Sequence, residues 1–246
     1  MWDCHCHLAD PGWDCHLEER LQEARQKGIF GWLSCAYDSA SWARQVQLAK
    51  IPGVLIALGI HPWAAAEWNA QSSSLLRQSL KISGAVAVGE CGLDYHRARD
   101  TQSRQQQLWA LREQLSLALQ LELPVVLHCV RAQEPLLQEL DAAGPKLRAM
   151  LHGFLGTAQD AQAWLRRGVF LSLGPHAISR TDLMKSLPLD RVLIETDAPA
   201  RGSSLTDLVA VSQAWNQHQP LQDNHFEANL CRFLGISQRE TGRRPA

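Results

Sequence analysis

Residues 101–128 read TQSRQQQLWALREQLSLALQLELPVVLH, and this stretch contains both kinds of element from which the fold is built. Leucines at 108, 111, 115 and 119 recur at three- and four-residue spacing, which predicts an amphipathic helix over residues 101–122. Pro124 ends that helix, and the apolar run behind it, residues 125–128, has the composition of a buried strand. The stretch is therefore a helix that leads into a strand of a parallel sheet.

Working outward from this unit, the chain shows eight apolar runs of the same kind, each followed by a longer stretch with helical spacing. The runs are residues 2–7, 29–35, 54–59, 85–89, 125–128, 148–152, 169–173 and 192–196. Gly28, Gly84 and Gly168 precede three of them, where the C-terminus of a helix needs a left-handed residue. Eight such units predict an α/β protein with a closed (β/α)8 TIM barrel rather than a doubly wound sheet. We expect residues 1–246 to form a single domain.

The composition is that of a globular protein outside the membrane. The chain has 246 residues, the usual size of one such barrel, and 46% of them are hydrophobic. No apolar run approaches the ~18 residues of a membrane span, so no membrane association is expected. Because the first motif begins at Trp2, there is no room before it for a signal peptide, and a cytoplasmic location is expected.

Cysteine usage and net charge narrow the function classes further. Seven cysteines form no CxxC pair, and an odd number argues against a disulfide framework. The formal net charge of −1 gives no basic footprint for duplex nucleic acid. An anionic substrate must then be held by a local site, such as bound metal ions.

The first strand carries a candidate metal motif, Asp3-Cys4-His5-Cys6-His7. Strict alternation along a strand predicts that Asp3, His5 and His7 share one face, with Cys4 and Cys6 packed against the helix layer on the other. Two imidazoles on one face can hold one ion. For this motif alone, a pair of ordinary histidines is an equal alternative, and a cysteine-rich zinc site is the weaker one.

Four further ligand-type residues follow other predicted strands: Glu90, His128, His152 and Asp197. That position is where a TIM barrel builds its active site. Such groups are costly to bury singly, and shared ions would satisfy them all. Two ions about 4 Å apart can activate a water, with Glu90 as the bridging ligand and Asp197 as the general base. Mixed nitrogen and oxygen ligands fit Zn, Mn or Mg.

Other side chains are candidates for substrate binding. His61 follows the third strand and should reach the mouth of the barrel, where Trp63 can stack on a base and Tyr95 can line the substrate path. Packing is the alternative for Trp63 and Tyr95. The sequence has no GxSxG elbow, no Walker A loop and no GxGxxG after the first strand, so no nucleotide cofactor is implied.

Taken together, these motifs resemble the TatD family of metal-dependent deoxyribonucleases, within the amidohydrolase-like barrels, and the YjjV-like branch of the family is similar. The motifs that carry the resemblance are Asp3-Cys-His-Cys-His-Leu8, Leu58-Gly-Ile-His-Pro62, Val88-Gly-Glu-Cys-Gly-Leu-Asp94, Pro124-Val-Val-Leu-His128, Leu151-His-Gly-Phe154 and Glu195-Thr-Asp-Ala-Pro199. The late stretch Glu227-Ala-Asn-Leu-Cys-Arg-Phe-Leu-Gly235 resembles the terminal helix of the family.

The resemblance implies a ligand set and an activity. One ion would be bound by His5, His7, Glu90 and Asp197. The second would be bound by Glu90, His128 and His152. The implied activity is that of a 3′-5′ exodeoxyribonuclease on single-stranded DNA in the cytoplasm, in DNA degradation, repair or defence.

The resemblance also implies phosphate contacts, and here the sequence departs from the family. His61 would contact the scissile phosphate. The family commonly has Arg where Val130 stands, and Arg131 follows it, so a phosphate contact by Arg131 is an open expectation. No Arg-Asn-x-Pro element is recognisable in residues 201–223, which leaves substrate choice open.

Two other functions are carried as alternatives. The first keeps the metals and hydrolyses a small amide, ester or phosphoester. The second is a degenerate metal-binding partner subunit that associates with the products of neighbouring genes.

Overall fold

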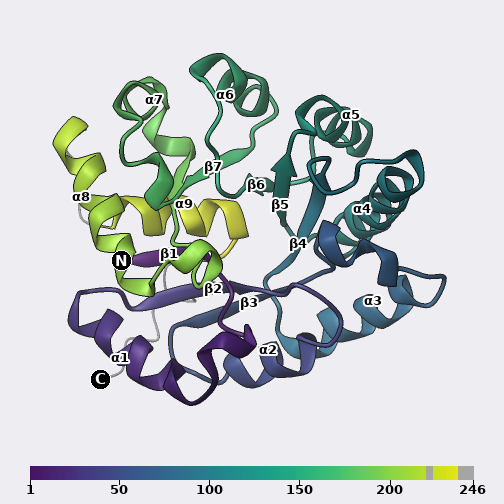
Figure 1. Cartoon of the computed structure of the whole chain (residues 1–246), viewed down its shortest axis with the longest axis horizontal. Coiled ribbons are helices and arrows are strands. Elements are labelled where there is room, and N and C mark those ends of the chain that lie inside the picture. The colour runs from purple at the N-terminus through teal and green to yellow at the C-terminus, as the bar shows by residue number, and fades with distance from the viewer. Residues whose placement is uncertain (220–223, 238–246) are drawn as a thin grey trace.

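The strands form one parallel sheet in sequence order, β1 to β8 (Figure 1). The computed structural model describes residues 1–219 and 224–237. Residues 220–223 and 238–246 lie outside this description, and so do the parts of the predicted domain and of the stretch 201–223 that fall on them. The strands are β1 Trp2–Cys6, β2 Gly31–Cys35, β3 Val54–Leu58, β4 Ala87–Asp94, β5 Val125–Val130, β6 Ala149–Leu151, β7 Phe170–Leu173 and β8 Val192–Ile194. The predicted TIM barrel is confirmed.

The seam between the first and last strands is closed by hydrogen bonds just beyond the end of β8. His7 N–H donates to Ala198 O at 2.8 Å, and Asp197 N–H donates to His5 O at 3.0 Å. The buried carboxylate of Asp3 accepts bonds from the backbone N–H of Thr196 at 3.0 Å and from its hydroxyl at 2.5 Å. These bonds place the segment that carries Asp197 beside the imidazoles of β1.

Helices surround the sheet on its outer side, as Figure 1 shows. They are α1 Leu17–Gln26, α2 Trp42–Leu48, α3 Ser72–Ser83, α4 Thr101–Leu121, α5 Gln133–Ala143, α6 Ala158–Leu165, α7 Thr181–Ser186 and α8 Leu208–His218, with α9 His225–Leu234 near β1. The predicted helix is α4: Asp100 caps it by accepting from Ser103 N–H at 2.8 Å, and Glu122, at φ 56°, ends it. Among the residues that the structure describes, no helix is long and apolar enough to span a bilayer.

Two apolar clusters hold the fold together. The larger lies between the sheet and the helices, where Leu111 and Leu115 of α4 are buried. The smaller fills the barrel interior and includes Val126, Met150 and Phe170 from successive strands. The helix α9 packs on β8 and β1 and adds Phe233 to this interior cluster, with its ring centroid 6.0 Å from that of Phe170. The end of the barrel opposite the strands' carboxyl ends is therefore closed by side chains.

Two bulges change what alternation predicted. In β1 the pairing register shifts between Asp3 and Cys6, so Cys4 lies in the interior cluster while Cys6 packs toward the helices. The prediction that Cys4 and Cys6 share one face is therefore wrong, because one extra residue reverses the alternation. In β4 a second shift lies between Val88 and Cys91, and Glu90 sits inside this longer strand instead of following it.

Candidate metal centre

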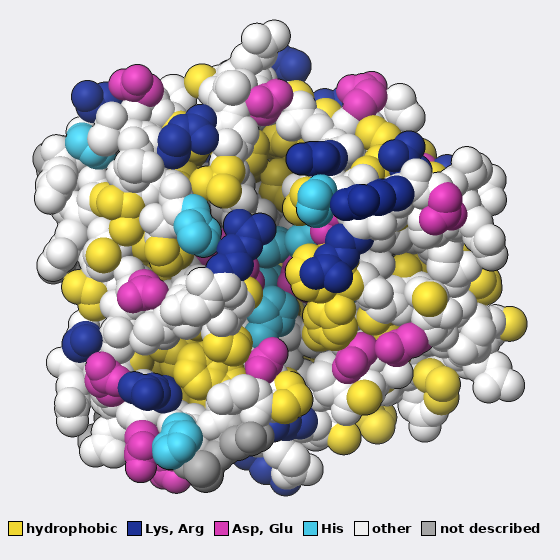
Figure 2. Space-filling model, viewed as in Figure 1, with side chains coloured by type: hydrophobic (Ala, Val, Ile, Leu, Met, Phe, Trp, Pro, Cys, Tyr) yellow, Lys and Arg dark blue, Asp and Glu magenta, His cyan; other side chains and the backbone are white. Residues whose placement is uncertain are grey.

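All six predicted ligands meet at the carboxyl ends of the strands. His5 lies on β1, Glu90 on β4 and His128 on β5. His7 and His152 come directly after β1 and β6, and Asp197 lies three residues beyond the end of β8. Figure 2 shows imidazoles at the bottom of a central hollow, with lysine and arginine side chains around its mouth. Residues far apart in the sequence are thus brought to one end of the barrel, as a TIM-barrel active site requires.

One group of four possible ligand atoms is closely spaced. The Nε2 atoms of His5 and His7 lie 3.2 Å apart, and each lies 3.2–3.4 Å from Glu90 Oε2 and from Asp197 Oδ1. Atoms that bind one zinc ion at about 2.0–2.1 Å in a tetrahedron are about 3.3 Å apart. Five of the six distances among these four atoms match that spacing, so the group can accommodate one small divalent ion.

A second group surrounds the other oxygen of the same glutamate. Glu90 Oε1 lies 2.9 Å from His128 Nδ1 and 2.8 Å from His152 Nε2, and the two nitrogens are 3.1 Å apart. Glu90 is 1% exposed, and within the described structure its Oε2 accepts no hydrogen bond. A buried carboxylate oxygen without a donor is costly unless a cation lies beside it. The donor set and its burial therefore fit bound metal.

The outer nitrogens of the imidazoles indicate which way their lone pairs point. His7 Nδ1 lies 3.1 Å from the carbonyl oxygen of Cys35, and His128 Nε2 lies 3.4 Å from Asp94 Oδ2. A carbonyl or carboxylate oxygen can only accept, so the outer nitrogen must carry the proton. The inner nitrogen then presents a lone pair to the cluster, which is the form that binds metal.

His61 is held in the opposite tautomer, with its proton on the nitrogen that faces the cluster. Its Nε2 lies 3.3 Å from both Glu90 Oε1 and His128 Nδ1, close enough to be counted with them as a third possible ligand group. Its outer Nδ1, however, accepts the backbone N–H of Trp63 at 3.1 Å. Neutral His61 must therefore carry its proton on Nε2. It points a donor, not a lone pair, into the site, so we separate it from the metal ligands.

Burial and charge set the protonation of the ion-free cluster. Burial alone would raise the pKa of Glu90, but the charges of His152 and other imidazoles hold it well below its usual range. Burial alone would lower the pKa of His7, but the carboxylates of Asp197 and Glu90, each 3.3 Å from its Nε2, raise it to about 9. For His152 the charge of Glu90 overcomes burial and raises the pKa to about 10. For His61 burial dominates and lowers the pKa to about 4.

The predicted substrate contacts are placed unequally. His61 is buried in the cluster, and Trp63 stands beside it, 44% exposed, with its Nε1–H donating to Asp94 Oδ2 at 2.5 Å. Arg131 is exposed at φ 53° directly after β5, and none of the contacts among the described residues joins it to the cluster. Tyr95 is half-buried under Arg104, whose Cζ lies 4.6 Å from the ring centroid, so the structure does not bring it to the ligands.

Two supporting carboxylates had no predicted role. Asp94, at the end of β4, faces the outer nitrogen of His128. Glu195 is 1% exposed, accepts Gly153 N–H at 2.6 Å and has Oε1 3.5 Å from the outer nitrogen of His152. The available signal was their position: each is an acidic residue on the same short motif as a proposed ligand.

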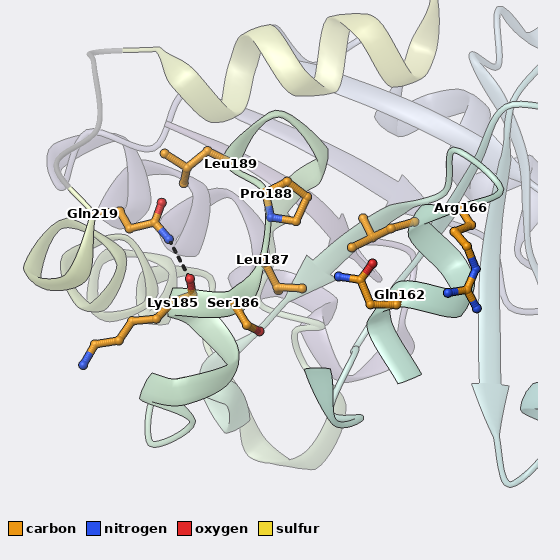
Figure 3. A pocket seen from close by; sticks show the side chains of 9 residues that line it. Gln162, Arg166, Lys185, Ser186, Leu187, Pro188, Leu189 and Gln219 are labelled. Atoms are coloured by element: carbon orange, nitrogen blue, oxygen red, sulfur yellow. Dashed lines mark hydrogen bonds between the residues drawn. The ribbon is translucent and has the colours of Figure 1, made fainter. Parts of the chain in front are cut away.

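A separate surface pocket of about 710 Å³ lies away from this chemistry. Its lining comes from the last turn of α6, the segment between α7 and β8, and the end of α8, where Gln219 donates to the backbone of Lys185 at 3.5 Å (Figure 3). These elements meet where β8 begins, at the opposite end of the strands from the ligands. The residues that line it include no histidine, carboxylate or cysteine, so none of these lining side chains is suited to bind a metal ion.

Comparison with known proteins places this geometry in a family. The sequence pattern of the family described as "TatD related DNase" matches residues 2–217. The "3'-5' ssDNA/RNA exonuclease TatD" of Erwinia tasmaniensis is 33% identical over 208 residues, which cover 81% of this chain and 80% of that protein.

The "Uncharacterized metal-dependent hydrolase YjjV" of Escherichia coli K12 is 36% identical over 205 residues, which cover 80% of this chain and 78% of that protein. The crystal structure of YjjV from E. coli K12 matches with a TM-score of 0.86 at 30% identity, covering 95% of this chain and 97% of that one. An uncharacterized amidohydrolase from Saccharomyces cerevisiae, at 16% identity and a TM-score of 0.67 over 98% of this chain and 96% of its own, shares the fold alone.

Proposed function

Since the chain belongs to the family of TatD-related DNases, we propose that it is a metal-dependent phosphodiesterase that degrades single-stranded DNA from its 3′ end and holds two divalent ions. The relative from Erwinia tasmaniensis, named a 3'-5' ssDNA/RNA exonuclease, supports the substrate and the polarity. None of the six cysteines whose side chains the structure describes forms a disulfide bond, which supports the cytoplasm as the compartment.

One observation carries the proposal: the two oxygens of Glu90 face two different sets of ligand atoms. Oε2 faces the imidazoles of β1 with Asp197, and Oε1 faces His128 and His152. A carboxylate in this position can bridge two ions. When bound, such ions supply Lewis acidity, which favours ionisation of a water and neutralises charge on a phosphate. Zn, Mn and Mg remain candidates because the ligands mix nitrogen and oxygen.

Two side chains have roles of their own beside the ions. Asp197 is the most open of the acidic ligands, with 28% of its side chain exposed against 1% for Glu90, so a water can reach it. Burial would raise its pKa, but hydrogen bonds with His5 and His7 hold the pKa well below the usual range, so it stays a carboxylate that can accept or orient a proton. His61, neutral near pH 7, offers its Nε2–H to a phosphate oxygen.

The test couples metal analysis with a nuclease assay. The purified protein is stripped of metal, reloaded with Mg, Mn or Zn, and incubated with single strands labelled at the 3′ or the 5′ end. We expect two ions per chain and mononucleotides released first from the 3′ end. Release from the 5′ end, or internal cleavage, would refute the polarity; an unreactive protein with two ions would favour the partner-subunit alternative.

A substrate panel separates the nuclease from its hydrolase alternative. Single-stranded DNA, single-stranded RNA, small phosphate esters and N-acyl compounds are offered to the loaded protein under the same conditions. The proposal predicts the highest kcat/KM on a nucleic acid strand. A higher value on a small amide or ester would replace the nuclease with the alternative substrate class.

A further inference from the structure

Two exposed aromatic side chains from different loops meet beside the metal centre. Tyr37 follows β2 and is 38% exposed, and Trp63 follows β3 and is 44% exposed. Their ring centroids lie 6.2 Å apart with the rings nearly perpendicular. Exposed aromatic surface is unfavourable in water, so a pair gathered at the mouth of a site indicates a ligand that covers it.

An arginine completes this group. The Cζ of Arg97 lies 3.7 Å from the ring centroid of Trp63. Burial raises the pKa of Tyr37, and the nearby charge of Arg97 opposes that rise. Within the described part of the chain, no carboxylate forms an ion pair with Arg97, which is exposed. The guanidinium is therefore free to meet an anion. We call Tyr37, Trp63 and Arg97 the rim group.

The rim group is fixed to the metal centre through His61 and Asp94. The ring of Tyr37 stacks on that of His61 with centroids 5.0 Å apart and 18° between the planes. The backbone N–H of His61 also donates to the backbone carbonyl oxygen of Tyr37 at 2.8 Å. Asp94 accepts from Trp63 Nε1–H at 2.5 Å and from Arg97 N–H at 3.0 Å, and it also faces His128. The rim group therefore lies directly beside His61, the side chain proposed to donate a hydrogen bond to the phosphate.

We propose that the rim group is a nucleotide subsite. One of the two rings stacks on the base of the nucleotide next to the scissile phosphate, the other, nearly perpendicular to it, packs against the edge of that base, and Arg97 pairs with a neighbouring phosphate. Stacking of this kind accepts every base, because each has a π-face, and an arginine adds charge without reading sequence. The inference rests on the proposed nuclease function. It adds a contact with an unstacked base, which would make the enzyme prefer single strands to duplexes.

The base-stacking part is tested by binding, separately from hydrolysis. The metal-loaded protein is titrated into fluorescent single-stranded oligothymidylate with phosphorothioate linkages, which resist cleavage, and into the same strand with abasic sugars at its 3′ end. Anisotropy should show about tenfold tighter binding of the strand that has bases. In Trp63→Leu and Tyr37→Leu that ratio should fall toward one. Trp109→Leu, which removes a tryptophan 42% exposed on α4, is the matched control and should keep the ratio.

The arginine part has its own readout in salt dependence. Arg97→Gln should weaken both strands equally and lower the slope of log affinity against log salt by about 0.7, one phosphate contact. Arg166→Gln, exposed at the end of α6, should leave the slope unchanged.

The outcomes separate this inference from the proposed function. A wild-type ratio that persists in Trp63→Leu and Tyr37→Leu, an unchanged slope in Arg97→Gln, or a loaded protein that binds neither strand would overturn the rim group as a nucleotide subsite. Base-dependent binding without hydrolysis of an ordinary phosphodiester strand would overturn the nuclease function and leave the subsite standing. Melting temperatures equal to that of the wild type show that the variants are folded.

Discussion

Metal uptake by the ion-free protein should release protons and strengthen as the pH rises. The pKa of His7 is about 9 and that of His152 about 10, so both imidazoles are protonated at pH 7. An ion binds only the neutral imidazole and must displace these protons. His5, whose pKa is also raised, can add to them, so two protons is a lower bound. Each proton contributes about tenfold per pH unit below the pKa of its imidazole, so each ion should bind about 50- to 100-fold more tightly at pH 9 than at pH 7, and the two affinities multiplied together should rise by about 10³- to 10⁴-fold.

Titration calorimetry measures the released protons directly. Zinc is titrated into chelator-treated, dialysed protein at pH 7 in two buffers with different ionisation enthalpies, and the difference in heat gives the proton count. His7→Gln should release about one proton fewer. His16→Gln, at an imidazole that is 65% exposed and outside the cluster, is the control and should leave the count unchanged. An affinity that is flat from pH 7 to 9 with no proton release would refute ligation by these imidazoles.

Three further predictions follow from the same contacts. Glu195→Gln should lower the affinity for the ion at His152 alone, by about 10- to 100-fold, because a carboxylate no longer faces the outer nitrogen of His152. Competition with a chromogenic chelator measures both affinities, and an equal loss for the two ions would contradict this prediction. His61→Ala should keep both ions by elemental analysis yet lower kcat by about 10²- to 10³-fold, whereas loss of an ion would make His61 a ligand. The ion-free protein should lose stability as the pH rises: His7 and His152 have folded pKa values above their ordinary 6.5, so their contribution is complete below about pH 6.5 and is lost through about pH 9 to 10. Urea unfolding of the chelator-treated protein should show this fall, and a midpoint that rises from pH 7 to 10 would refute it.

The barrel could be predicted because its signals are local. Each buried strand is a short apolar run, and α4 is indicated by its leucine spacing and by Pro124 beyond its end. The extension of β4 to Asp94 could not be seen in this way, because Cys91-Gly92-Leu93 with its glycine is typical of a turn. The bulge in β1 was equally hidden, since its cause is pairing with a distant strand.

The convergence of the six proposed ligands could be predicted from the sequence, and the contacts of the side chains around them could not. His128 and Asp197 were found because a polar residue after a buried strand must reach the mouth of a barrel. The tautomer of His61 is set by the backbone N–H of Trp63, which donates to its Nδ1, and only the three-dimensional structure reveals this contact. The pairing of Tyr37 with Trp63 likewise joins two loops whose contact no spacing in the sequence indicates.

Crystals grown with zinc or manganese, with data collected at the metal absorption edge, test the central claim most directly. The account predicts two anomalous peaks roughly 3.5–4 Å apart, with the carboxylate of Glu90 between them, one peak beside His5 and His7 and the other beside His128 and His152. A single peak, or two peaks that Glu90 does not join, would contradict it.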